Sequence, residues 1–129
     1  MQIALKVVVG LMALLFLFMG VNLMFDPVGG APGFSVTPLG ADGLNTIRGD
    51  LGGMFVTSGV LLVLGIIQQK AQWFYAGAIL MGVIAFGRLV GFVVDGGPSD
   101  VTMPAFIAEL VFLAILTFAG MKATPAAPA

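Results

Sequence analysis

The chain has 129 residues, of which 60% are hydrophobic and 9% charged, whereas soluble domains are about half apolar and a quarter charged. Cys and His are both absent, which excludes thiolate chemistry, disulfides, imidazole catalysis and the commonest zinc and haem ligands. The net charge of −1 and the five dispersed cations exclude a basic surface for nucleic acid. We therefore expect one membrane bundle without a separate soluble domain.

The first apolar run, residues 3–25, is close to the ~20 residues that a helix needs to cross the hydrocarbon core. A cleaved signal peptide is the alternative, because Lys6 precedes a long apolar stretch. The segment Asn22–Pro27 offers no small-x-small cleavage site, however, and this favours a retained transmembrane span.

The next segment, residues 26–46, is rich in proline and glycine, so we expect an irregular loop on the outer side of the membrane. Long loops of this kind are often lids or disordered segments. Phe34, Val36 and Leu39 are apolar side chains with which this loop could pack onto the mouth of the bundle.

Three further apolar runs of near-bilayer length follow at residues 47–67, 73–94 and 104–121. The short polar turn at 68–72 makes the second and third spans antiparallel neighbours, and Trp73 and Tyr75 lie where an interfacial aromatic belt is expected. The sequence thus predicts an all-α, four-helix transmembrane bundle over residues 1–122. Residues 123–129, rich in Pro and Ala, are expected to form a flexible tail.

The basic residues predict the orientation of this bundle. Lys6, Lys70 and Lys122 all fall on the face that holds both termini, and the positive-inside rule makes that face cytoplasmic. All acidic residues and both arginines fall toward the opposite face. Because the spans follow from hydropathy alone, this segregation of charge supports them independently.

Several polar side chains are predicted to lie at one depth inside the membrane. Arg88 is seven residues before Asp95, and Glu109 is five residues after Pro104, which places both roughly 8–10 Å below the outer helix ends. Charges that face lipid are costly, so we expect Arg88 to turn inward and pair with Glu109 or Asp50. The candidate site is an outward-facing network of Asn22, Arg48, Asp50, Arg88 and Glu109. It has two equally weighted interpretations, a ligand pocket or a device that fixes which helices are neighbours.

Small residues recur on the predicted helices, and they allow helix backbones to approach closely, either within the bundle or at a partner. Gly87 with Gly91 and Ala78 with Gly82 form small-xxx-small pairs. The glycines at 49–53 could delay the start of the second helix and leave backbone amides to hold an anion. We interpret the eight methionines as flexible core filler rather than a copper(I) path, and expect no metal site.

The segments Asn45–Gly53 and Ala85–Gly91 resemble an uncharacterised bacterial family of small four-helix membrane proteins that is distantly similar to DoxX-like proteins. The resemblance runs from the first span through the fourth. It implies the fold and a location in the bacterial inner membrane, and it supplies no catalytic residue to carry over.

Three functions are compatible with these observations. The first is a non-enzymatic accessory subunit that packs against a larger membrane complex or a second copy, as the glycine-rich helices suggest. The second is a carrier or binder of a small anionic or amphiphilic molecule, with Arg48 and Arg88 as charge partners. The third, an enzyme with Glu109 or Asp50 as acid or base, is the least favoured because no nucleophile stands beside them. No catalytic residue is predicted, and the sequence indicates no particular cofactor.

Overall fold

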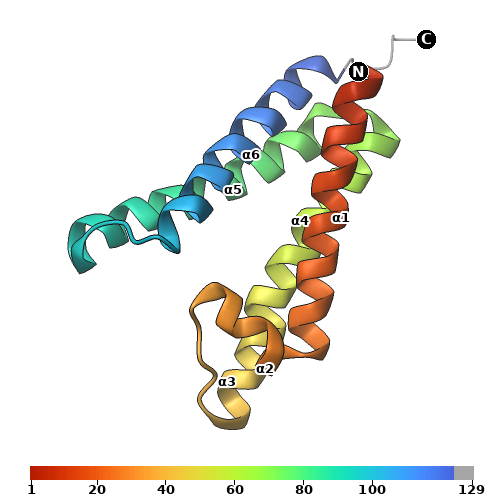
Figure 1. Ribbon diagram of the computed structural model, residues 1–129. Coiled ribbons are helices and arrows are strands. Elements are labelled where there is room, and N and C mark those ends of the chain that lie inside the picture. The colour runs from red at the N-terminus through yellow and green to blue at the C-terminus, as the bar shows by residue number, and fades with distance from the viewer. Residues whose placement is uncertain (124–129) are drawn as a thin grey trace. The chain divides into compact units, whose positions relative to one another are not determined.

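Figure 1 shows the computed structural model of the chain, in which residues 1–123 are described. Every regular element within these residues is a helix, which confirms the predicted all-α class. Four of the helices are long and apolar enough to cross a membrane, as the sequence predicts. They are Ile3–Phe25, Gly40–Gln68, Ala71–Gly96 and Thr102–Lys122, and they fit a multi-pass membrane protein.

The described chain divides into two compact units. The loop unit is Gly10–Val63 and contains most of α1 (Ile3–Phe25) and the first part of α4 (Gly53–Gln68). The hairpin unit is Met1–Val9 together with the chain from Leu64 onward, and it contains α5 (Ala71–Gly91) and α6 (Thr102–Lys122). A single bundle of residues 1–122 stays a prediction. The predicted flexible tail lies outside the described residues, except for Ala123.

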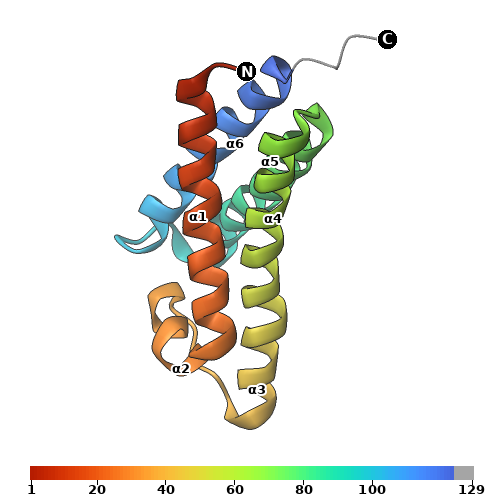
Figure 2. The same cartoon turned by 90° about the vertical axis from the view of Figure 1, so that its right-hand side faces the viewer.

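In the loop unit, α1 and α4 run side by side and approach closely at glycines (Figure 2). A Cβ atom on Gly20 would lie 2.6 Å from the backbone nitrogen of Val56, and one on Gly59 would lie 3.0 Å from the carbonyl oxygen of Ala13. Small residues let two membrane helices bring their backbones into contact in this way. These glycines therefore allow the backbones of α1 and α4 to pack closely against each other.

The segment between α1 and α4 is largely helical, so the expectation of an irregular loop is wrong for most of it. It contains α2 (Pro27–Gly30), the 3₁₀ helix η1 (Ala31–Phe34) and α3 (Gly40–Thr46). Asp26 starts α2, because its Oδ1 accepts a hydrogen bond from the backbone N–H of Gly29 at 3.0 Å and Pro27 follows at the first helical position. Caps and proline therefore begin helices in a segment whose composition is typical of loops.

Apolar side chains of residues 26–46 pack on the helices of the loop unit. Phe34 and Val36 pack against a buried cluster formed by Leu23, Ala31 and Ile47. The ring of Phe34 lies 5.2 Å from that of Phe55, measured between centroids. The expected packing is thus confirmed for Phe34 and Val36, whereas Leu39 is 83% exposed and does not contribute.

We expect Phe34→Ala to lower the free energy of unfolding in detergent by about 2 kcal/mol, because the partly buried ring loses its contacts with Phe55. The matched variant Leu39→Ala should change it by less than about 0.5 kcal/mol, since this side chain is exposed. Equal effects of the two substitutions on detergent unfolding curves would contradict this packing.

The second span begins earlier than predicted. Instead of starting at residue 47, the helix begins with α3 at Gly40, continues through the π-helix η2 (Ile47–Gly52) and passes into α4. The hypothesis of free amides at residues 49–53 is therefore wrong, because these glycines lie inside a continuous helix. The backbone N–H of Gly53, for example, already donates to the carbonyl oxygens of Gly49 and Asp50.

The remaining spans are also slightly longer than predicted. The third extends beyond α5 into a second π-helix, η3 (Phe92–Gly96), and the fourth is α6. The turn between α4 and α5 shortens to Gln69 and Lys70. Gln69 has a positive φ of 53°, a conformation that closes a helix end within very few residues.

The hairpin unit is built on antiparallel packing of α5 and α6 (Figure 1). One stripe of α5 is buried at Phe74, Ala78, Met81 and Ala85, a spacing that repeats on one face of a helix. Three residue pairs show the register of α5 against α6. Tyr75 packs on Gly120, and Gly82 lies opposite Leu113. The rings of Phe92 and Phe106 are in contact. When the buried stripe of α5 is continued by one turn past Ala85, the next position is Arg88.

Candidate ligand-binding site

The centre of the candidate site is an ion pair between α5 and α6. Nε of Arg88 donates a hydrogen bond to Oε1 of Glu109 at 2.7 Å. The Glu109 side chain is 11% exposed and that of Arg88 is 32% exposed, and the pair is the only salt bridge within residues 1–123. Glu109 is the first of the two partners that the sequence suggested for Arg88. The pair satisfies the requirement that charges inside a membrane turn inward.

The ion pair leaves hydrogen-bonding capacity on both partners. A guanidinium has five N–H donors, and Arg88 uses only the one on Nε for a bond among the described residues. Oε2 of Glu109 is buried and has no hydrogen-bond partner in that part of the chain. A buried oxygen in this condition costs about 1–3 kcal/mol. Arg88 therefore binds Glu109 through Nε, and the N–H donors of its two Nη groups make no hydrogen bond among the described residues.

Arg88 also lines an open cavity of about 490 Å³ at the end of the hairpin unit where η3 connects to α6. A cavity of this volume suits a small molecule or a headgroup. Its walls come from α5, from η3 and from the connection to α6. The lining residues are Ile84, Gly87, Arg88, Gly91, Phe92, Asp95, Gly97, Ser99 and Thr102. Glu109 is not among them, so Arg88 is the one member of the ion pair that a ligand in this cavity can reach.

The connection between η3 and α6 is shaped by glycine and by reciprocal hydrogen bonds between Ser99 and Thr102. Gly96 and Gly97 have φ angles of 110° and 76°, which favour glycine, and they reverse the chain after η3. The backbone N–H of Ser99 donates to Oγ1 of Thr102 at 2.8 Å, and the N–H of Thr102 donates to Oγ of Ser99 at 3.2 Å. These bonds tie Ser99 to Thr102, the first residue of α6, and fix one wall of the cavity.

A family model described as a domain of unknown function (DUF4345) matches residues 4–119, which is most of the chain. The chain belongs to the DUF4345 family. No curated protein and no solved structure matches it. The Arg88–Glu109 pair and the whole cavity lie inside the DUF4345 match.

Arg48, a second charged residue of the predicted network, forms a hydrogen bond within the loop unit of this DUF4345 chain. Its Nη1 donates a hydrogen bond to the carbonyl oxygen of Met24, in the last turn of α1. The last carbonyls of a helix have no partner within the helix, and a cation is favourable there. Arg48 therefore has a structural role as a cap of α1.

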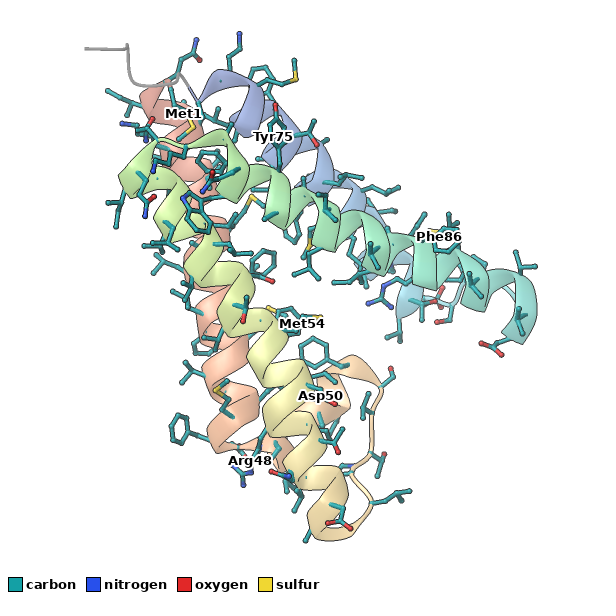
Figure 3. The ribbon with its side chains drawn as sticks, turned by 180° about the vertical axis from the view of Figure 1, so that it is seen from behind. Met1, Arg48, Asp50, Met54, Tyr75 and Phe86 are labelled. Carbon is teal, nitrogen blue, oxygen red and sulfur yellow. The ribbon has the colours of Figure 1, made fainter. Side chains whose placement is uncertain are left out.

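Asn22 and Asp50 are the other predicted residues of the loop unit, and both are exposed. Arg48 and Asp50 point to different sides of η2 (Figure 3), as expected for residues two positions apart on a helix. They do not form an ion pair with each other. A network that joins all five predicted residues stays a prediction.

Asp95 was not among the predicted site residues, because its position in the sequence predicted only the end of the third span. The structure places Asp95 in the same cavity wall as Arg88. The sequence does contain a pattern that points to Asp95. Positions 88, 91 and 95 share one face of a helix, and they carry a cation, a small residue and an anion. This pattern predicts two opposite charges on one face with open space between them.

Proposed function

We propose that this DUF4345 protein binds a small amphiphilic molecule through an anionic group that meets Arg88 in the cavity of the hairpin unit. The supporting observation is the position of Arg88, which is held by Glu109 at Nε and lines the cavity. Guanidinium groups recognise carboxylate and phosphate through paired N–H donors, and the Nη groups of Arg88 are suited to this. Ile84 and Phe92 supply apolar wall for the rest of the molecule.

The test compares bound small molecules in two purified proteins by native mass spectrometry from mild detergent. The wild type should retain an amphiphile that carries an anionic group, and the double variant Arg88→Gln/Glu109→Gln should lose it. Changing both partners avoids leaving a buried, unpaired carboxylate. Lys70→Gln, which removes an exposed cation at the other end of α5, should retain the ligand. Identical bound species in all three proteins would contradict the proposal.

The second candidate function is a non-enzymatic accessory subunit of a larger membrane complex, or a homo-oligomer. It is favoured by the open glycines of the loop unit, because a Cβ on Gly49 or Gly53 would meet no atom within 4 Å. Such positions admit the backbone of another helix. Affinity purification of a tagged chain in mild detergent discriminates the two functions. A stoichiometric membrane protein or second copy supports the subunit, whereas an isolated monomer with a bound amphiphile supports the binder.

We further propose a bacterial inner membrane location with both termini in the cytoplasm. The resemblance to DoxX-like proteins supports the location, and the positions of Lys6, Lys70 and Lys122 support the orientation. Because the chain has no cysteine, single cysteines can test this without background labelling. In intact cells an impermeant maleimide should label Thr37→Cys, and it should label Gln72→Cys only after permeabilisation. The reverse pattern would contradict the orientation.

A further inference from the structure

The charges of the cavity do not favour a simple anion. Arg88 is already neutralised by Glu109 at 2.7 Å, and Asp95 adds a carboxylate to the cavity wall. Together the three side chains carry one net negative charge. The net negative charge of these side chains would repel a ligand that carries only negative charge, because like charges at close range repel.

Asp95 is available to a ligand. Among residues 1–123 it takes part in no salt bridge and its carboxylate accepts no hydrogen bond. The hydroxyl groups of Ser99 and Thr102, which also line the cavity, are engaged with each other at 3.1 Å and with backbone N–H groups. The polar side chains left to recognise a ligand are therefore Arg88 and Asp95, one of each sign.

Gly91 lies between these two charged residues in the wall of the cavity. The Oδ2 atom of Asp95 bends back along the helix and lies 3.7 Å from the position of a Cβ on Gly91. Gly91 is three residues after Arg88, a rise of about 4.5 Å. The absence of a side chain on Gly91 leaves the cavity open between the guanidinium and the carboxylate. Two opposite charges thus line one cavity, one on each side of Gly91 in the sequence.

On the basis of the proposed function, we infer that the ligand is a zwitterion that carries both a phosphate and a primary ammonium. The phosphate accepts hydrogen bonds from the Nη groups of Arg88, and the ammonium donates to Asp95. This pairing compensates the net negative charge of the cavity. The same chemistry occurs in a phosphatidylethanolamine headgroup and in free phosphoethanolamine, and the apolar wall formed by Ile84 and Phe92 suits the lipid.

The experiment measures binding to the full chain in detergent by native mass spectrometry, with phosphatidylethanolamine, phosphatidylcholine and phosphatidylglycerol of matched acyl chains. Phosphatidylcholine keeps the positive charge but has no N–H donor, and phosphatidylglycerol has no cation. The wild type should prefer phosphatidylethanolamine to both by about tenfold, the effect of one charge-assisted hydrogen bond. Asp95→Asn should reduce the preference over phosphatidylglycerol to less than about twofold.

The matched control is Asp100→Asn, which removes a nearby exposed carboxylate that does not line the cavity and should leave the preference unchanged. Competition by free phosphoethanolamine as strong as that by the lipid would support the same recognition with a soluble ligand. Equal binding of the three lipids, or an unchanged preference in Asp95→Asn, would overturn the zwitterion inference while leaving Arg88 as an anion site. Unchanged binding in Arg88→Gln/Glu109→Gln would instead overturn the proposed function itself.

Discussion

Arg88→Gln is expected to lower the free energy of unfolding of the purified protein by about 3 kcal/mol, the lower end of the range for breaking a buried ion pair. The substitution removes the cation that neutralises the carboxylate of Glu109, whose side chain is 11% exposed and whose Oε2 has no hydrogen-bond partner among the described residues. The cost is therefore that of an isolated buried charge and exceeds the value of the bond itself. Reversible unfolding in mixed micelles measures it.

The double variant Arg88→Gln/Glu109→Gln provides the decisive comparison. Two neutral amides can hydrogen-bond to each other at the same positions, so most of the lost stability should return, and the two single effects should be strongly non-additive. Lys70→Gln, at an exposed position, serves as the charge control. Additive effects of the two substitutions would show that Arg88 and Glu109 do not stabilise the protein as a pair.

Gly20→Ala is the second substitution with a large expected effect, a loss of about 2 kcal/mol from the free energy of unfolding. The new methyl group would lie 2.6 Å from the backbone nitrogen of Val56 and 2.8 Å from the carbonyl oxygen of Gly52. Both contacts are with backbone atoms of the opposing helix segment, which cannot rotate away as a side chain can. The two helices must therefore separate at this point.

Gly53→Ala is the matched control, because it makes the same chemical change in the same unit where a Cβ meets nothing within 4 Å. Alanine is a better helix former than glycine, so this variant should gain up to about 1 kcal/mol. The two substitutions are thus expected to differ in sign in the same unfolding assay. A stabilising Gly20→Ala would contradict the close packing of α1 on α4.

The four apolar helices are predictable because span length and hydropathy are local properties of the chain. The equal depth of Arg88 and Glu109 follows in the same way, by counting residues from the helix ends. Outside the spans, composition did not predict the structure. The proline and glycine content of residues 26–46 suggested a loop, whereas Asp26 and Pro27 act at particular positions to begin α2.

The sequence by itself determined the all-α class, the number of long apolar helices and the presence of ionisable side chains within them. Only the tertiary structure decided which of the two candidate carboxylates pairs with Arg88, that Arg48 instead caps α1, and that Asp95 shares a cavity wall with Arg88. The reason is physical. Hydropathy acts on each helix separately, while the partner of a side chain depends on the rotation and register of two packed helices, which are determined by close contacts such as Tyr75 on Gly120 and Gly20 on Val56.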